Sequence, residues 1–280
     1  MRKNKIVTFL LLGIVLISCQ KEKNDGKLFI IGGGRVNTAM IDKMIEESGI
    51  DKGGYMVILP MSSAEPLESI KYTDSSFKER QDIEIYGFNI IKGEPVADSR
   101  IDSIRNAKLI FISGGDQSRF LDVIEGTPVK QAIHDAFKSG SLIAGTSAGA
   151  SVMSKIMVTG NELKYPDDSG NFESIESGNI ETIEGLGLLE SVIIDQHFIV
   201  RKRMNRMISY SIENPNHLCV GIDEGTAIYV EGQNATVYGK RQVVVLRNSS
   251  AKTKIENGLL GSRNMQLNVF LPGESFQLNQ

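Results

Sequence analysis

The chain has 280 residues, a hydrophobic fraction of 41%, a formal net charge of -3 and no tryptophan. This is the composition of ordinary globular material, and the core must be mainly aliphatic because aromatic residues are sparse. Since no basic block alternates with aromatic residues, the composition argues against a nucleic-acid-binding protein, and we expect no nucleic acid partner.

The N-terminus has the pattern of a secretory signal peptide. Basic residues open the chain, and the apolar run over 6–16 is too short to span a bilayer comfortably. Cys19 follows a small residue at the expected cleavage point, an arrangement that resembles the lipobox of bacterial lipoproteins. Residues 1–18 are therefore predicted to be removed and Cys19 to be lipidated, which would anchor the chain to a membrane. A plain signal anchor, or a secreted protein with a chance cysteine, is the alternative.

The remainder of the chain divides into a polar tether over 19–26 and a single predicted domain over 27–280. We expect this domain to be exported and held on the cell envelope, on the periplasmic or the outer face. Cys219 is the only other cysteine, so no intramolecular disulfide is expected once Cys19 is lipidated. Because Cys219 lies in an apolar run, we expect it to be a small buried hydrophobic residue.

Predicted strands and helices alternate along the first half of the domain. This alternation predicts an α/β fold with a mostly parallel central sheet and helices on both faces, whose site lies at the carboxyl ends of the strands. The first strand ends in Gly32-Gly33-Gly34, which suggests a dinucleotide site, but the G-x-G-x-x-G spacing is missing. The predicted strands cover 27–31, 56–59, 84–91, 109–113 and 142–144, and the predicted helices cover 38–48, 62–79, 101–107, 118–124 and 129–139.

The second half of the domain is expected to extend the sheet. Residues 159–186 are polar and aperiodic, which indicates an exposed excursion that carries a hairpin and forms a rim over the site. In the helix predicted over 200–212, Arg203 and Arg206 fall opposite the apolar face, whereas Arg201 lies at the flank nearest His197. Later strands, followed by a last strand pair, predict an antiparallel extension near the C-terminus. The strands of this half cover 188–194, 219–223, 227–230, 235–238 and 243–246.

The segment 145–149 is a G-x-S-x-G sequence between an apolar strand and a predicted helix that runs on to residue 155. A serine at such a turn is pushed out of the sheet, and the helix N-terminus places the N–H of Ala148 where an oxyanion develops. The sequence therefore predicts that Ser147 is a nucleophile. The alternative is a turn of small residues that only lets the helix and the sheet pack closely.

A serine nucleophile needs a base, and the chain has three histidines from which to choose. His197 ends a buried strand at the expected sheet edge of Ser147, so we predict that it is the base. His134 lies within an amphipathic helix and is expected at the surface. His217 lies in a turn and is expected to be a capping or surface residue. A core histidine satisfied by the backbone is the alternative for His197.

The acid that orients the base is expected at the end of a buried strand. Glu224 is the first choice, with Asp223 and Asp195 as competitors, because a carboxylate in such a place is costly unless it is paired. This order along the chain is serine, histidine, acid. It differs from the serine, acid, histidine order of α/β-hydrolases, which argues against a lipase or an esterase.

Four segments of the chain carry a family resemblance. They are ISGGDQSRF at 112–120, AGTSAGASVM at 144–153, DQHFIVRKRMNRM at 195–207 and GIDEGTAI at 221–228. In order and spacing they resemble the cyanophycinases of peptidase family S51. Asp116-Gln117 and Thr146 favour this branch over its sister branch, the aspartyl dipeptidases.

This resemblance implies a fold like that of class I glutamine amidotransferases, a homodimer, and no metal or other cofactor. The implied activity is that of a serine peptidase that hydrolyses aspartyl-arginine-type (iso)peptide bonds through an acyl-enzyme. Ser147 would be the nucleophile, His197 the base and Glu224 its orienter, and the N–H groups of Gly115 and Ala148 would form an oxyanion hole. Residues linked to substrate binding or site integrity would be Asp116, Gln117, Asp195, Gln196, Arg201, Arg203 and Arg206. A structural role as ion-pair partners is the alternative for Arg203 and Arg206.

Two departures from the family pattern bear on the substrate. The segment 35–37 reads Arg-Val-Asn where the family often has acidic residues, and Gly225 stands where it tends to have asparagine. Both are expected to change the fit of the substrate more than the peptidase chemistry. A non-catalytic lipoprotein that binds peptide or sugar on this scaffold, an aspartyl dipeptidase and an esterase remain alternatives.

Overall fold

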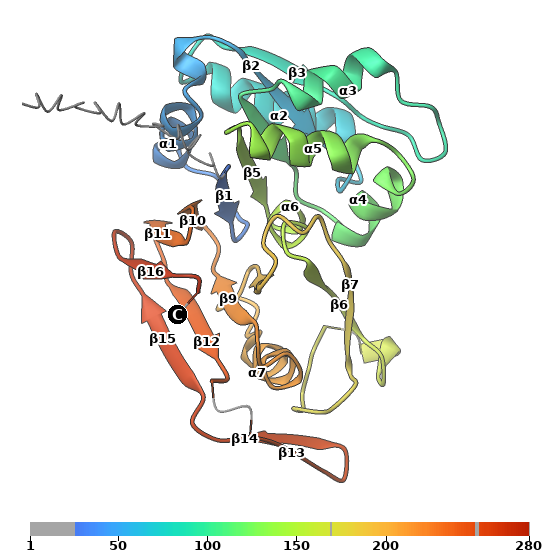
Figure 1. Cartoon of the computed structure of the whole chain (residues 1–280), viewed down its shortest axis with the longest axis vertical. Helices are drawn as coiled ribbons and strands as arrows, with labels where there is room; N and C mark the ends of the chain where they lie inside the picture. Colours follow the sequence, from blue (N-terminus) through green and yellow to red (C-terminus); the bar gives the residue numbers. More distant parts are fainter. Residues whose placement is uncertain (1–25, 169, 250–251, 280) are drawn as a thin grey trace, which may run out of the picture.

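The computed structural model describes residues 26–168, 170–249 and 252–279 (Figure 1). The predicted signal peptide, Cys19 and most of the predicted tether lie outside these residues. In the part of the chain that is described, no helix is both long enough and apolar enough to cross a membrane.

The centre of the fold is an eight-stranded sheet whose five parallel strands and three antiparallel strands lie side by side. The predicted α/β fold, with a mostly parallel sheet and an antiparallel extension, is confirmed. The strand predicted over 84–91 is shorter and ends at Gly87, and the strand predicted over 188–194 begins only at Val192. In spatial order the strands are β16 (Ser275–Gln277), β11 (Asn234–Gly239), β10 (Thr226–Glu231), β1 (Lys27–Ile31), β5 (Leu142–Thr146), β4 (Leu109–Ile112), β2 (Tyr55–Leu59) and β3 (Glu84–Gly87).

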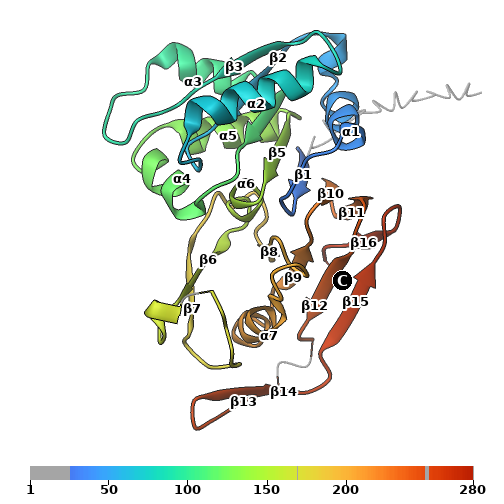
Figure 2. The same cartoon turned by 180° about the vertical axis from the view of Figure 1, so that it is seen from behind.

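Helices cover both faces of the parallel part, as predicted (Figures 1 and 2). The apolar residues of α1 (Thr38–Ser48) recur at helical spacing and pack with α2 (Pro66–Lys78) on one face. On the other face lie α3 (Asp98–Arg105), α4 (Gln117–Ile124) and α5 (Val129–Lys138). Because the helices lie on the two faces, they leave the carboxyl ends of β1, β4 and β5 uncovered. This is the edge at which such sheets bind their ligands.

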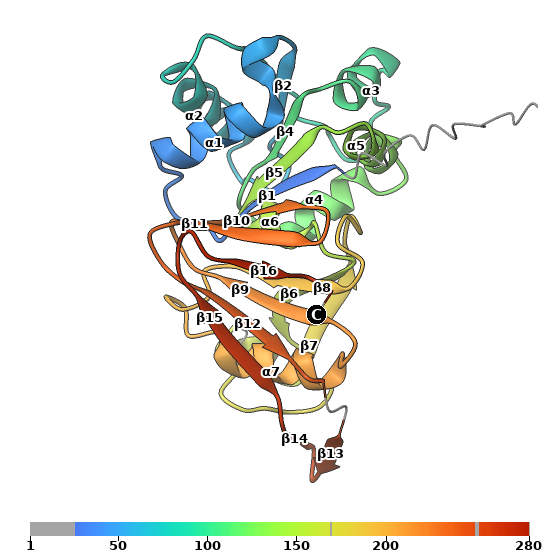
Figure 3. The ribbon, with the colours of Figure 1, turned by 60° about the vertical axis from the view of Figure 1, so that its left-hand side comes forward.

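A second sheet packs against the antiparallel half of the first, in the order β15 (Gln266–Phe270), β12 (Val243–Arg247), β9 (Leu218–Ile222) and β8 (Val192–Asp195) (Figure 3). The prediction that strands 219–223 and 243–246 extend the central sheet is therefore wrong. Both faces of β9 are buried, because Val220 and Ile222 pack toward the central sheet and Cys219 packs toward α7 (Met204–Glu213).

Several predicted helices are shorter than their sequence patterns suggest, and the helix predicted over 62–79 begins only at Pro66. The helix after Ser147 is only α6 (Ala148–Ser151), because the next backbone groups bond to a neighbouring segment instead of continuing the helix. Val152 accepts from the N–H of Leu186, and Lys155 donates to the carbonyl of Leu189. Likewise, α7 begins at residue 204 and not at 200, since a series of turns precedes it.

The excursion over 159–186 carries a hairpin, as predicted, made of β6 (Ile156–Glu162) and β7 (Ile180–Glu184). A buried carboxylate fastens its loop, since Glu162 accepts hydrogen bonds from the N–H of Phe172 at 2.7 Å and from Asn179 at 2.9 Å. The loop is thereby held against α7, where the guanidinium of Arg206 stacks on the Phe172 ring.

The C-terminal strands behave differently from the single pair that was predicted. β13 (Thr253–Glu256) and β14 (Leu259–Ser262) form a separate hairpin at the lower end of the molecule in Figure 1. The strands after it divide between the two sheets, with β15 pairing with β12 and β16 with β11.

Candidate active site

Ser147 occupies a strained turn between β5 and α6. Its backbone angles, φ 53° and ψ -112°, fall in a region that residues other than glycine rarely adopt, at a cost of about 1–3 kcal/mol. The two flanking glycines are needed for close packing. A Cβ would stand 2.3 Å from the carbonyl oxygen of Gly149 if placed on Gly145, and 2.2 Å from that of Ile112 if placed on Gly149. The turn thus holds the hydroxyl at the carboxyl end of the sheet.

Three side chains from separate parts of the chain form one hydrogen-bonded line. Ser147 Oγ lies 2.8 Å from His197 Nε2, and His197 Nδ1 lies 2.6 Å from Glu224 Oε1. Ser147 ends β5, whereas His197 follows β8 and Glu224 follows β9. The base was expected at the same sheet edge as Ser147, but it comes from the second sheet. The structure nevertheless brings the three residues together, in the geometry that lets an imidazole take a proton from a hydroxyl.

The two competing acids have other partners. Asp223 accepts hydrogen bonds from the N–H groups of Ile199 and Val200 and pairs with Arg241 at 3.0 Å. Asp195 forms an ion pair with Arg206. Neither aspartate contacts the imidazole of His197, which leaves Glu224 as the acid at the base.

The other two histidines stand apart from this line. His134 is half-buried rather than at the surface as predicted, and His217, for which a capping role was the other possibility, is half-buried as well. His134 Nε2 lies 2.6 Å from the carbonyl oxygen of Leu186, which explains why its ring is partly covered. Neither histidine is among the residues that line the cavity at Ser147.

Burial lowers the pKa of His197 below its ordinary value of 6.5, although the hydrogen bond to Glu224 acts in the opposite direction. The positive charges of Arg201 and Arg203 lower this pKa further. The imidazole is therefore neutral near pH 7 and able to accept a proton.

The two residues predicted to form an oxyanion hole, Ala148 and Gly115, belong to segments next to Ser147. Ala148 opens α6, so its N–H precedes the first hydrogen bond within that helix. Gly115 lines the same cavity as Ser147 and has φ 137°, and a Cβ on it would stand 2.1 Å from the carbonyl oxygen of Ser62. A Cβ on Gly114 would stand 3.3 Å from Ser147 Cβ, so the loop after β4 lies beside Ser147.

A cavity of about 530 Å³ opens at Ser147. Its charged lining consists of three arginines and one aspartate, so an anionic group is favoured there. The lining residues are Gly115, Asp116, Gln117, Ser118, Ser147, Thr159, Gly160, Asn161, Gly170, Gln196, Arg201, Arg203 and Arg206.

The arginines do not divide between two helix faces as predicted. Arg206 is 3% exposed, and its Nε lies 2.8 Å from Asp195 Oδ2. Arg203 lies before the first residue of α7, contacts Asp195 Oδ1 at 3.4 Å and donates to the carbonyl of Gln196. Burial and the charge of Arg206 lower the pKa of Arg203 to about 10, which still leaves it charged at neutral pH. Both arginines are thus paired and face the cavity, while Arg201 is exposed.

The predicted polar residues of the cavity are mostly held by the backbone. Asp116 caps α4 by accepting from the N–H groups of Ser118 and Arg119, and Gln117 donates to the carbonyls of Val158 and Thr159. These contacts tie α4 to its loop and to β6, so they shape the wall of the cavity. Gln196 Oε1 lies 3.4 Å from Ser147 Oγ.

Sequence reasoning missed part of the site. Thr159, Gly160, Asn161 and Gly170 line the cavity, and the sequence indicated only that an excursion would form its rim. It also missed Tyr210, which is buried in α7 and whose Oη lies 3.3 Å from Asp195 Oδ2. A tyrosine on an apolar helix face was the available signal, since a buried phenol needs a partner.

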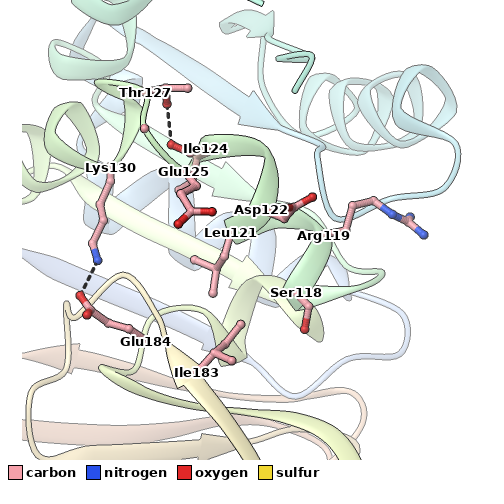
Figure 4. Close-up of a pocket in the computed structure, with 11 residues that line it drawn as sticks. Ser118, Arg119, Leu121, Asp122, Ile124, Glu125, Thr127, Lys130, Ile183 and Glu184 are labelled. Carbon is pink, nitrogen blue, oxygen red and sulfur yellow. Dashed lines mark hydrogen bonds and ion pairs between the residues drawn. The ribbon is translucent and has the colours of Figure 1, made fainter. Parts of the chain in front are cut away.

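A second, larger cavity of about 900 Å³ lies between α4, α5 and β7 (Figure 4). Lys130 crosses part of it to pair with Glu184 at 2.9 Å. None of the predicted site residues lines it, although Ser118 borders both cavities. Within the described ranges of the chain, no group of three or more His, Cys, Asp or Glu side chains could hold a metal ion.

Comparison with known proteins identifies the family to which the chain is similar. The model of peptidase family S51 matches residues 28–238. Cyanophycinases from a strain of Nostoc sp. and from Trichormus variabilis are each 32% identical over 234 residues, which cover 81% of this chain and 76% of theirs. Peptidase E of Actinobacillus pleuropneumoniae is 29% identical over 153 residues, or 51% of this chain and 59% of its own.

Solved structures share the fold. The crystal structure of a peptidase from an acI-B1 actinobacterium superposes with a TM-score of 0.65 at 23% identity, over 90% of this chain and 96% of that one. A second structure, from Listeria monocytogenes, gives a TM-score of 0.54 at 17% identity, over 77% and 98% of the two chains. The resemblance to cyanophycinases that the four segments carry is thus confirmed. Because the family model covers well over half of the chain, this protein belongs to peptidase family S51 and is a peptidase.

Proposed function

We propose that Ser147, His197 and Glu224 are the nucleophile, base and orienting acid of a serine peptidase that cleaves aspartyl-arginine-type (iso)peptide bonds. The observation that carries this proposal is the unbroken hydrogen-bonded line from Ser147 Oγ through the imidazole to Glu224, at 2.8 and 2.6 Å. Its position on the rim of an arginine-lined cavity, and the kinship with cyanophycinases, support the substrate class.

The reaction would begin when Ser147 Oγ attacks the carbonyl carbon of the scissile bond while His197 Nε2 takes the hydroxyl proton. The carbonyl oxygen becomes an oxyanion that the N–H groups of Gly115 and Ala148 would stabilise. When the C–N bond breaks, the imidazolium returns its proton to the leaving amine and an ester to Ser147 remains. Water then attacks this ester, with His197 as base, and releases the acid and the free serine. Glu224 would hold the Nδ1 proton and the ring orientation throughout.

The charges of the cavity indicate which part of the substrate it would hold. Asp195 pairs with both Arg203 and Arg206 and offsets one of their two positive charges. The remaining positive charge, together with that of the exposed Arg201, would bind a carboxylate. Such a carboxylate is available on an aspartyl residue linked through its side chain. Asp116 is the one acidic residue in the lining and would suit a cationic arginine side chain.

The test is Ser147→Ala assayed by mass spectrometry on a panel of β-linked Asp-Arg and α-linked Asp-Xaa peptides. We expect the wild type to release β-Asp-Arg dipeptides and the variant to lose activity by several orders of magnitude. Ser139→Ala, at an exposed serine of the α5 C-terminus, is the matched control and should behave as wild type. Unchanged turnover in Ser147→Ala would refute the proposal.

The same panel separates the alternatives. Faster cleavage of α-linked Asp-Xaa peptides would indicate an aspartyl dipeptidase. Faster cleavage of acyl esters would indicate an esterase. A fluorophosphonate probe should label wild-type Ser147 and not the alanine variant, and failure to label the wild type would favour a non-catalytic binding protein.

We also propose that the protein is an exported lipoprotein anchored through Cys19. The support is the signal-peptide pattern of residues 1–18 and the small residue before Cys19. Growth with a labelled fatty acid should label the wild type and not Cys19→Ser, and equal labelling of the two would overturn this proposal. The homodimer that the resemblance implies is a prediction for sedimentation analysis.

A further inference from the structure

The end of β1 and the turn that follows it bond through their backbone to Ser147, to His197 and to the residue after Glu224. The carbonyl oxygens of three consecutive residues, 31 to 33, accept these hydrogen bonds. That of Ile31 accepts from the N–H of Ser147 at 3.0 Å, and that of Gly32 accepts from the N–H of His197 at 2.6 Å. The next, that of Gly33, accepts from the N–H of Gly225 at 2.9 Å, one residue after Glu224. One short segment therefore sets the relative positions of three loops that lie far apart in the sequence.

The glycines of this turn are required by close approach. A Cβ on Gly32 would stand 2.3 Å from the carbonyl oxygen of Ile222, and one on Gly34 would stand 3.1 Å from Glu224 Cβ. The tightest approach to a functional group is at Gly33, where a Cβ would stand 2.3 Å from His197 Cε1 and 2.5 Å from His197 Nε2. Nε2 is the atom that faces Ser147 Oγ, so the missing side chain of Gly33 leaves room for the proton-accepting edge of the ring.

A nucleotide-binding role does not account for the glycine at position 33, and its positive φ is only one of two reasons for it. A dinucleotide loop would need a spacing that this turn lacks. The φ of 104° at Gly33 favours glycine for its backbone freedom alone. The second reason is that the His197 imidazole occupies the space that a Cβ on Gly33 would need. Gly53 shows the difference, since it has φ 115° and nothing within 4 Å of its Cβ position.

We propose that Gly33 is a positioning residue for the base, and that the carbonyls of Ile31, Gly32 and Gly33 align the nucleophile, the base and the loop of the orienting acid. This inference rests on the proposed function, because it assumes that His197 acts as the base. A methyl group at position 33 must push the ring away from its present place, and a misplacement of about 1 Å can reduce a rate by about 10²-fold.

The kinetic test compares Gly33→Ala with Gly53→Ala, its matched control for strain at positive φ. We expect kcat of Gly33→Ala to decrease by about 10²-fold with KM within about threefold of wild type, because the arginine-lined cavity is untouched. Gly53→Ala should keep both constants. Wild-type kcat in a folded Gly33→Ala variant would overturn the proposal.

A stability cycle keeps the inference testable even if Gly33→Ala folds poorly. We would measure Tm for Gly33→Ala and for Gly53→Ala, each in the wild-type and the His197→Ala backgrounds, using the full chain. Removing the imidazole removes the clash, so the decrease in Tm caused by Gly33→Ala should shrink by roughly half or more in the His197→Ala background. Folding of Gly33→Ala only in the His197→Ala background would also support the proposal.

The decrease caused by Gly53→Ala should be the same in both backgrounds. Equal decreases for Gly33→Ala in the two backgrounds would mean that strain alone acts there, and the positioning role would be refuted. This cycle needs no substrate, so its result is distinct from the outcome of the Ser147→Ala test of the proposed function.

Discussion

At the scale of single residues, His197 sets the expected pH dependence. Its pKa lies below 6.5 because burial disfavours the charged ring, and the neutral form needed in a base therefore persists into mildly acidic solution. We expect the rate of fluorophosphonate labelling of Ser147 to fall with decreasing pH through a midpoint below 6.5. A midpoint above that value would contradict the lowered pKa.

The charge of Arg201 is one cause of this lowering, and it can be removed. Arg201→Gln should raise the pKa of His197 and move the labelling midpoint to higher pH. Because the probe is not the peptide substrate, a change in substrate affinity does not affect this measurement. Lys202→Gln, at the exposed neighbouring position, is the control and should leave the midpoint unchanged. No movement in the Arg201 variant would show that this guanidinium does not act on the base.

At the scale of elements, the β6–β7 hairpin decides the shape of one cavity wall. Its loop depends on the buried carboxylate of Glu162, and Glu162→Ala removes hydrogen bonds to Phe172 and Asn179 that are worth about 1–3 kcal/mol together. When the loop is released from α7, the cavity wall that it forms should loosen. The Glu162→Ala variant should therefore have a higher KM for the peptide substrate, with little change in kcat. Steady-state kinetics and limited proteolysis within residues 163–179 would measure both effects.

Glu173→Ala is the matched control, because this glutamate belongs to the same loop and is exposed. It should keep wild-type KM and resistance to proteolysis. If Glu162→Ala also kept both, the loop would not depend on the buried carboxylate for its position at the cavity.

The α7 region shows why the arginine positions escaped prediction. The apolar periodicity over 200–212 indicates a helix, but it does not reveal that residues up to Arg203 form turns. The buried position of Arg206 depends on Asp195, whose partner is fixed only when β8 and α7 come together. A charged residue on a helix is normally expected to be exposed, and only a tertiary partner reverses that expectation.

At the scale of the whole molecule, one carboxylate connects the first strand, the first helix and a late strand. Glu47 of α1 lies 3.2 Å from Lys27 Nζ, 2.7 Å from Lys43 Nζ and 2.7 Å from Tyr229 Oη. Partial burial opposes its charge, but the hydrogen bonds from Lys43, Tyr229 and Lys27 lower the pKa of Glu47 to about 2. A depressed pKa stabilises the fold above the unfolded value of 4.5, and this contribution is lost as pH falls toward 2.

Glu47→Gln should therefore lower Tm at pH 7, by the equivalent of about 1–2 kcal/mol, and the difference from wild type should vanish between pH 4.5 and 2. Calorimetry over this range is the measurement. Glu46→Gln is the control, since that side chain is 70% exposed and its pair with Lys43 adds little. A pH-independent difference for Glu47→Gln would rule out the ionised carboxylate as its cause.

The sequence by itself determined the local structure and the family of this protein. Helical periodicity predicted α1 and α5, apolar runs predicted the parallel strands, and the small residues around Ser147 predicted the strained turn. These features depend on residues close together in the chain, which is why they could be predicted. For the carboxylate beside His197, the local pattern indicated three acids at strand ends. It could not decide between them.

Only the tertiary structure decided which sheet each late strand joins and what surrounds the base. β9 is apolar on both faces, a pattern that fits either sheet, and its place became clear only because a second sheet lies between the central sheet and α7. The same layering brings His197 onto the turn after β1, where Gly33 leaves room for its ring. The physical reason is that burial on two faces and close backbone approach depend on partners from distant parts of the chain, which no local pattern specifies.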